Sequence, residues 1–215
     1  MTDFAAARRN MVDGQVRTAD VTDLRIITAM LEVRREAFLP PAKAALAYLD
    51  LDVPLGGGRC LIKPMVLAKL IQAADLAGSD RVLDVGCATG YAAAVLARIA
   101  GEVVTLEQDA GLAQAARAAL ASLPNVAVQS GTLTEGWPQG GPYDAIMVEG
   151  AIEFMPEALL RQLKDGGRLV CVLGSGPGAK AMLYRRSGHE TGRRAIFDAA
   201  APLLPGFVKP PQFAF

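Results

Sequence analysis

Between residues 81 and 173 the chain alternates short apolar runs with amphipathic segments, and no other feature restricts its fold as strongly. The apolar runs predict five strands, at residues 81–85, 102–107, 126–129, 144–148 and 168–173. Amphipathic segments at 91–99 and 110–120 predict helices between the first three strands. Strands that are apolar throughout and joined by helices are typical of a parallel sheet covered on both faces. We therefore expect an α/β fold with a doubly wound, mostly parallel, Rossmann-like sheet.

The flanking segments predict two additions to this sheet. Residues 3–46 carry apolar side chains at helical spacing and predict an N-terminal helical extension. Prolines and three consecutive glycines within residues 50–64 predict a loop, and a helix is expected over 64–76. Two strands joined by a turn are predicted at 179–186 and 193–198, which gives an antiparallel edge. The last residues, with Pro202, Pro205, Pro210 and Pro211, are expected to be irregular.

Length and composition favour one domain. A chain of 215 residues with 52% hydrophobic content can bury a single large core. We expect one domain over 1–215, in which 1–64 form the helical extension and an active-site loop, and 65–215 form the ligand-binding α/β core. Three cysteines without a CxxC pattern and the single His189 predict neither disulfides nor a metal site.

The charge balance limits the classes of partner. Because 22 Lys and Arg residues balance 22 Asp and Glu residues, no general field attracts nucleic acid or an anionic membrane, and neither is expected as a partner. The arginine pairs, Arg34 with Arg35 among them, are expected on solvated faces. The N-terminus is polar and the apolar runs are short, so that a cytoplasmic protein is expected, and we expect a monomer.

The first predicted strand runs directly into a turn of small residues. The segment reads Asp84-x-Gly86-x-Ala88-x-Gly90 and is followed by a predicted helix, whose N-terminus offers free N–H groups to a ligand. A dinucleotide-binding turn has the pattern G-x-G-x-x-G, which fails here because Ala88 and Tyr91 occupy the third and sixth positions. The predicted ligand contacts in this turn are Asp84, Gly86, Cys87, Ala88, Thr89 and Gly90.

A second carboxylate follows the next strand. Glu107 closes the run Val103 to Leu106, where its two oxygens can accept hydrogen bonds from both hydroxyls of a ribose. Taken alone, Glu107 could equally be a solvated strand end. Together with an acidic residue two positions before the first glycine, it favours S-adenosyl-L-methionine, whose methionyl end carries positive charge. Gln108 is expected beside it.

Several separated segments resemble the protein-L-isoaspartate (D-aspartate) O-methyltransferase family. Residues 9–12 resemble its opening helix, and 35–40 (REAFLP) resemble its R-E-x-F-V-P signature. Residues 48–58 resemble the segment that leads into its active-site loop, and further blocks match at 90–97, 136–137 and 143–146. The resemblance implies a class I methyltransferase fold and an enzyme that methylates the carboxylate of isoaspartyl residues in damaged proteins. Its acceptor would be a protein or peptide that bears isoaspartate.

Three positions depart from the family pattern. Residues 58–64 stand where the family reads G-Q-T-I-S-x-P, so that Ile62 replaces the serine expected to face the reacting groups. Thr132, followed by Leu133, replaces an aspartate that would contact the adenine amino group. Glu149 stands near the expected acceptor site and would repel a carboxylate unless it is protonated or paired, for which the candidate cations are Arg59 and Lys63.

Glu149 leaves the acceptor open. It could be a strand-end residue turned to solvent, or a general base and cofactor contact for an acceptor that loses a proton, such as an amine or hydroxyl. The family reaction needs no base, because a carboxylate is already a nucleophile. The alternatives to an isoaspartyl transferase are therefore a methyltransferase for another protein or small molecule, and a catalytically weak S-adenosylmethionine-binding module.

Overall fold

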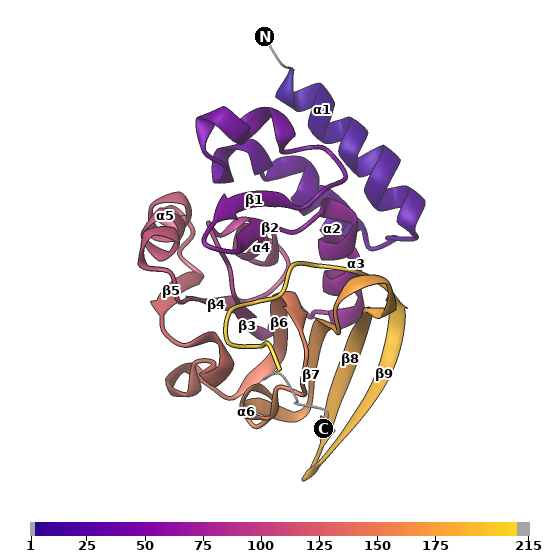
Figure 1. Cartoon of the computed structure of the whole chain (residues 1–215), viewed down its shortest axis with the longest axis vertical. Coiled ribbons are helices and arrows are strands. Elements are labelled where there is room, and N and C mark those ends of the chain that lie inside the picture. Colours follow the sequence, from indigo (N-terminus) through magenta and orange to yellow (C-terminus); the bar gives the residue numbers. More distant parts are fainter. Residues whose placement is uncertain (1–2, 210–215) are drawn as a thin grey trace, which may run out of the picture.

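A seven-stranded sheet forms the centre of the computed structural model, which describes residues 3–209 (Figure 1). The strand order is β5-β4-β3-β6-β7-β8-β9, so that the chain enters in the middle and winds towards both edges. All neighbours from β5 to β7 pair in parallel, whereas β8 and β9 pair antiparallel at one edge. The doubly wound, mostly parallel α/β fold with an antiparallel edge is confirmed.

The predicted strands are all present, and some continue beyond their apolar runs. They are β3 (Arg81–Val85), β4 (Glu102–Glu107), β5 (Val126–Ser130), β6 (Tyr143–Ile152), β7 (Leu163–Leu173), β8 (Lys180–Ser187) and β9 (Glu190–Asp198). The helices beside them are α3 (Pro64–Ala74), α4 (Tyr91–Leu96), α5 (Ala110–Leu120) and α6 (Glu157–Leu160). β7 is longer than predicted because its ladder already begins at Leu163, opposite Tyr143, and β6 is longer because it continues to Ile152, opposite Leu173.

Successive side chains of the central strands enter two different clusters of apolar residues. On one face Val82, Val103 and Met147 pack with the N-terminal helices and with α3, α4 and α5. On the other face the neighbouring side chains of the same strands pack with the 133–135 turn, α6 and the C-terminal segment, which contributes Leu204 and Phe207. The C-terminal segment thus helps to cover this face of the sheet, together with the short helix α6.

The N-terminal extension is helical, as predicted. It consists of α1 (Phe4–Met11), a π-helical turn (Val12–Val16), a 3-10 turn (Arg17–Ala19) and α2 (Leu24–Glu32), followed by two further 3-10 turns. The carboxylates of Asp3 and Asp23 accept backbone N–H bonds at the starts of α1 and α2, which are the N-cap interactions expected of aspartate. No helix among residues 3–209 has both the length and the apolar character needed to cross a membrane.

Arg35 corrects one expectation about this extension. Its side chain is 1% exposed, whereas Arg34 beside it is exposed. Arg35 Nε donates to the Ala47 carbonyl (2.8 Å) and Nη2 donates to the Ile62 carbonyl (2.7 Å). Its guanidinium also lies over the ring of Tyr91, 4.6 Å from the centroid. The prediction that both members of this arginine pair are solvated was wrong, because Arg35 ties two chain segments together inside the protein.

Residues 50–64 form a hairpin instead of the predicted loop. β1 (Val53–Gly56) pairs antiparallel with β2 (Arg59–Leu61), and Gly56, Gly57 and Gly58 turn the chain with positive φ angles. The Lys43 ammonium donates to the Pro54 carbonyl (2.6 Å), which ties the hairpin to the extension. The hairpin matters because it carries Arg59 to the carboxyl edge of the sheet.

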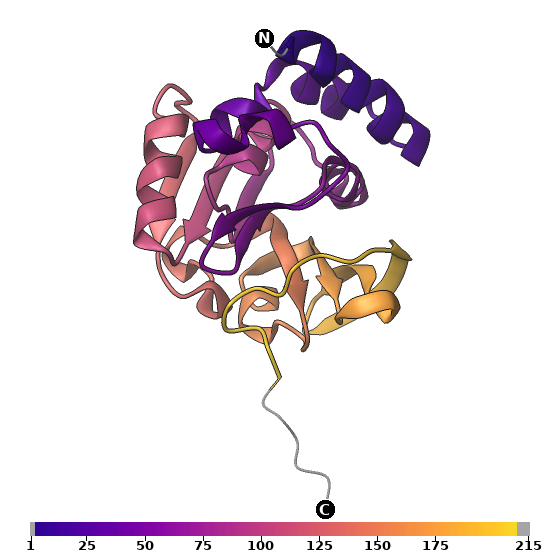
Figure 2. The ribbon, with the colours of Figure 1, turned by 45° about the horizontal axis from the view of Figure 1, so that its top comes forward.

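The C-terminal segment crosses the same edge of the sheet. After β9 it runs back over β6, and in Figure 2 it passes below the tip of the β1–β2 hairpin. Backbone hydrogen bonds fix it there: Ala151 N–H donates to the Pro202 carbonyl and Leu204 N–H to the Ala151 carbonyl, both at 2.9 Å. The segment has no helix or extended strand, as predicted, and Pro210 and Pro211 lie outside the described residues.

Candidate functional site

The turn after β3 has the backbone of a ligand-binding loop. Gly86 and Gly90 have φ angles of 82° and 94°, which glycine adopts readily. Ala88 also has a positive φ, of 51°, which is strained for a residue with a Cβ. A Cβ on Gly90 would lie 2.7 Å from Leu120, so that glycine there lets α5 pack against the loop. Thr89 Oγ1 donates to the Phe38 carbonyl (2.6 Å) and joins the loop to the N-terminal extension.

Glu107 lies at the end of β4, directly beside this loop, and is completely buried. Its Oε2 accepts the Ala88 N–H at 2.8 Å, and its Oε1 accepts the N–H groups of Gln108 and Asp109 at 2.9 and 3.1 Å. The interpretation of Glu107 as a solvated strand end is thereby excluded. These backbone donors satisfy part of a fully buried carboxylate, which still has to be paired with a cation.

That cation, in this structure, is Arg59 of the hairpin. Arg59 Nη2 lies 2.8 Å from Glu107 Oε2, and both side chains are almost inaccessible, at 3% and 0%. The same Nη2 donates to the Gly86 carbonyl at 2.5 Å. Burial opposes the charge of Arg59, but the bonds to Glu107 outweigh it, and the pKa of Arg59 is raised. The expectation that Arg59 pairs with Glu149 is replaced by a direct ion pair with Glu107.

Arg59 and Leu204 together fill the space above Gly86. A Cβ placed on Gly86 would lie 3.0 Å from Arg59 Nη2 and 3.2 Å from Leu204 Cδ2. Leu204 also lies 2.6 Å from the Cβ position of Gly150, on the neighbouring strand β6. The small residues of the loop therefore leave a hollow, as the sequence predicts, and two side chains from distant segments occupy it.

Asp84 and Glu149 form a buried pair of carboxyl groups under the loop. Asp84 is completely buried and its Oδ2 accepts a hydrogen bond from Thr105 Oγ1 (2.9 Å) on β4. Burial raises the pKa of Asp84 to about 6. Burial, and then the neighbouring charge of Asp84, raise the pKa of Glu149 well above its ordinary value. Glu149 is therefore the member of the pair that holds a proton at neutral pH.

The surroundings of Glu149 decide between its two predicted roles. It is 3% exposed, near the end of β6, where the register with β7 shifts between Met147 and Ala151. The interpretation as a strand-end residue turned to solvent is excluded. A protonated Glu149 is also a poor general base, because a base must be free of its proton to accept another.

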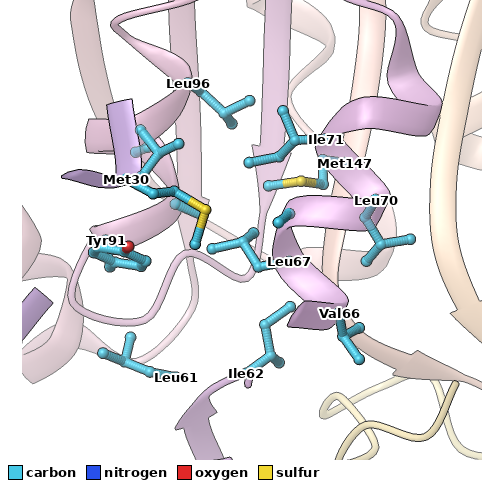
Figure 3. Close-up of a cluster of buried hydrophobic side chains, with 14 of the residues drawn as sticks. Met30, Leu61, Ile62, Val66, Leu67, Leu70, Ile71, Tyr91, Leu96 and Met147 are labelled. Carbon is cyan, nitrogen blue, oxygen red and sulfur yellow. The ribbon is translucent and has the colours of Figure 1, made fainter. Parts of the chain in front are cut away.

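Ile62 and Lys63 directly follow β2 of the hairpin. The Ile62 side chain is 1% exposed and packs in the apolar cluster of α3, next to Val66 and Leu67 (Figure 3). Lys63 is half-buried; its backbone N–H donates to Asp52 Oδ1 (2.8 Å), and its ammonium makes no ion pair among residues 3–209. Neither side chain neutralises Glu149.

The remaining predicted contacts lie at or just after the carboxyl ends of β4 and β5, which we call the rim of the candidate site. Gln108 and Thr132 are exposed at the carboxyl ends of β4 and β5, whereas Leu133 is buried in the second apolar cluster. Gly131 lies against Trp137, whose ring is 3.7 Å from its Cβ position. Trp137 packs beside the rim and can report on its occupation.

Two residues near the loop were missed by the sequence interpretation. Leu204 was missed because its proline-rich segment shows no periodicity that would assign it to the sheet edge. Thr105 was missed although it stands at a buried strand position, where a lone hydroxyl among apolar residues signals a polar partner on the next strand.

Comparison with known families and proteins agrees with this geometry. The family model described as protein-L-isoaspartate(D-aspartate) O-methyltransferase matches residues 7–197. A protein-L-isoaspartate O-methyltransferase of Methylorubrum populi is 42% identical over 209 residues, which cover 96% of this chain and 98% of that protein. Protein-L-isoaspartate O-methyltransferase 1 of Rhodopseudomonas palustris is 46% identical over 184 residues, or 85% of this chain and 75% of that protein.

Solved structures give the same result at the level of the fold. A structure of a protein-L-isoaspartate O-methyltransferase superposes with a TM-score of 0.80 and 25% identity, and the match covers 93% of this chain and 66% of that chain. A second, from Plasmodium falciparum, is a complex with S-adenosyl-L-homocysteine; its TM-score is 0.74 at 18% identity, with 92% and 97% coverage.

Proposed function

The chain belongs to the protein-L-isoaspartate(D-aspartate) O-methyltransferase family, and from this we propose that it transfers a methyl group from S-adenosyl-L-methionine to the carboxylate of isoaspartyl residues in proteins. One observation in the structure supports this most directly. The glycine loop after β3 and the carboxylate at the end of β4 meet at the same edge of the sheet, joined by the hydrogen bond from Ala88 to Glu107. This is the edge at which α/β sheets bind their ligands.

The residues present fit the cofactor chemically. Glu107 would accept the ribose hydroxyls, and the carboxyl of Asp84 would favour the positively charged methionyl end through the loop. The small residues of the loop, with Cys87, Thr89, Gln108, Thr132, Leu133 and Glu149 around them, would enclose the rest. When bound, the cofactor supplies an electrophilic methyl group. Arg59 and Leu204 would have to move from the space above Gly86 for this to happen.

The end of β6 that carries Glu149, where we place the acceptor, can accommodate a carboxylate. A protonated Glu149 carries no charge and does not repel an incoming carboxylate. Lys63, just after the hairpin, is the candidate cation for this carboxylate, and Arg59 can serve it only after leaving Glu107. Ile62 packs in the apolar cluster and offers no polar group. An isoaspartyl carboxylate is already a nucleophile at neutral pH, so that the work of the chain is to orient it and to exclude water.

Methyl transfer from radiolabelled cofactor tests the function directly. An isoaspartyl peptide should accept label that is released by mild base, as a methyl ester is, whereas the matching aspartyl peptide should not. Base-stable label on another acceptor would support an amine or hydroxyl methyltransferase instead. Binding of S-adenosylhomocysteine without transfer to any acceptor would support a binding module.

The organisation of the chain follows as part of the proposal. One apolar cluster runs from Met11 in α1 to Ala199 after β9, which favours action as a single domain over the whole chain. We propose a monomer in the cytoplasm, and the zero net charge supports only the absence of binding to nucleic acid and anionic membranes. Gel filtration against globular standards would test the oligomeric state.

A further inference from the structure

The ion pair between Arg59 and Glu107 occupies the carboxylate that the cofactor needs. Among residues 3–209, every hydrogen bond that Glu107 accepts is from the backbone or from Arg59. The backbone donors belong to the loop and to the start of α5, and they remain whether or not the cofactor is bound. Only Arg59 comes from another element, the hairpin, and only Arg59 can leave. A ribose that binds Glu107 must therefore replace this guanidinium.

Arg59 is also placed where it could bind a second anion after a ligand has displaced it from Glu107. Arg59 Nη2 shares the space above Gly86 with Leu204, and Leu204 also covers Gly150, the residue after Glu149, so that the guanidinium lies between Glu107 and the end of β6 that carries Glu149. Its present bonds are to Glu107 and to the Gly86 carbonyl, both of which belong to the cofactor side. Without Glu107 it is a buried cation that needs a new anion, because an unpaired charge in the interior is strongly unfavourable.

The acceptor of the proposed reaction supplies such an anion. An isoaspartyl residue carries a free carboxylate, and a guanidinium binds a carboxylate through two parallel hydrogen bonds. Resting on the proposed function, we propose that Arg59 couples the two binding events: it closes the cofactor site of the free protein by pairing with Glu107, and on cofactor binding it turns to hold the acceptor carboxylate. The cofactor then binds first and prepares the site for the acceptor.

Leu204 completes the closed arrangement from the opposite side. Its side chain covers Gly86 and Gly150, while its backbone is held by Ala151 of β6. The hairpin and the C-terminal segment thus meet above the loop, and both must shift to admit a ligand (Figures 1 and 2). If about 90% of the free protein is closed, the apparent affinity for the cofactor falls about tenfold.

The test measures binding of S-adenosylhomocysteine, which lacks the transferable methyl group. We expect Arg59→Gln to bind it about fivefold to tenfold more tightly than the parent, by calorimetry and by the fluorescence of Trp137. A merely structural role of Arg59 would weaken binding, so the direction of the change is decisive. Arg81→Gln is the matched control, because Arg81 pairs with Glu102 at the opposite ends of the same two strands (3.2 Å). It should leave the affinity unchanged.

The second half of the test uses an isoaspartyl peptide. The parent should bind it up to about tenfold more tightly when S-adenosylhomocysteine is saturating, and Arg59→Gln should lose this dependence and show a raised KM with a smaller change in kcat. Arg59→Lys should restore part of the dependence. Peptide affinity in the parent that is the same with and without S-adenosylhomocysteine would overturn the coupling.

Leu204→Ala keeps the inference testable if Arg59→Gln does not fold. It opens the space above Gly86 without changing a charge, and it should also tighten S-adenosylhomocysteine binding. Equal affinities in the parent and in either folded variant would overturn the closure by Arg59 and Leu204, while the proposed function would stand. No binding by the parent or by any variant would instead remove the proposed function.

Discussion

Asp84 and Glu149 are buried within hydrogen-bond reach of each other, and Asp84 Oδ1 and Glu149 Oε1 accept no hydrogen bond from any other side chain or from the backbone of residues 3–209. The two carboxyl groups belong to neighbouring parallel strands, β3 and β6. No ion pair joins either carboxyl to a lysine or arginine within the described range 3–209, and the pair is tolerated because Glu149 holds a proton. This arrangement gives the protein a pH dependence that can be measured without any ligand.

Glu149→Gln should make the folded protein less sensitive to alkaline pH. Both carboxyl pKa values are raised by folding, so the folded chain holds protons that the unfolded chain releases, and the free energy of unfolding falls as pH rises through about 6 and beyond. A neutral glutamine mimics the protonated acid. At pH 8 it should be more stable than the parent by about 2 kcal/mol, and at pH 4 the difference should vanish.

Urea unfolding at several pH values measures this effect. The control is Glu157→Gln, an exposed carboxylate of α6 whose replacement should leave the pH profile parallel to that of the parent. If the profile of Glu149→Gln is also parallel to that of the parent, Glu149 is ionised in the folded protein and the acceptor side carries a negative charge.

The Arg59–Glu107 pair should show strong coupling in a double-mutant cycle. Glu107→Ala leaves a buried guanidinium without its anion and should lower the free energy of unfolding by about 3–5 kcal/mol. Arg59→Ala should cost less, since three backbone N–H groups still bind Glu107. The double variant should be more stable than the sum of the two losses predicts, by at least about 1 kcal/mol. Additive losses would mean that the two groups do not interact in solution.

Arg35 should be essential for stability, although the arginine before it should not be. Arg35→Met removes the donors to the Ala47 and Ile62 carbonyls and the contact with the Tyr91 ring, and should cost about 2–4 kcal/mol. Arg34→Met, at an exposed position, should change the free energy of unfolding by less than about 0.5 kcal/mol. Thermal and urea unfolding of the two variants decide the matter; equal effects would show that Arg35 has no special anchoring role.

The local features of the fold were predictable, because the short-range pattern encodes them. The strands β3 and β4 and the helix α5 have the predicted bounds. Apolar runs predict the two strands and an alanine-rich segment predicts the helix, and neither prediction requires knowledge of distant contacts. The β1–β2 hairpin was missed. Two prolines and three glycines interrupt the alternation of apolar and polar residues that would predict its strands. The hydrogen bond from the Lys43 ammonium to the Pro54 carbonyl, which supports the hairpin, forms only in the folded chain and leaves no pattern in the sequence.

The site was predictable to the same extent. Asp84 and Glu107 stand at strand ends, and the parallel sheet brings strand ends together, so their proximity followed from the sequence. The partners of these carboxylates did not follow. Arg59 and Leu204 reach Gly86 from segments far away in the chain, and nothing in their local sequence states which of several charged or apolar neighbours they meet.

Ile62 is the residue at which the family pattern and the structure lead to opposite expectations. The pattern would have Ile62→Ser restore a hydroxyl at the acceptor and raise activity. In the structure the side chain is packed among apolar neighbours of α3, so a serine there leaves a cavity and a hydroxyl without a partner (Figure 3). We expect a loss of about 3–5 kcal/mol in the free energy of unfolding and no gain in methyl transfer.

Ile62→Val provides the matched control, since it removes one methylene group without adding a polar atom and should cost only about 1 kcal/mol. Activity on the isoaspartyl peptide is compared at a temperature well below the unfolding transition of every variant, so that loss of folded protein does not mask a gain in rate. A serine variant that is faster than the parent would place the side chain of residue 62 at the reacting groups. A serine variant that is unstable and no faster would show that residue 62 serves the apolar core behind the hairpin.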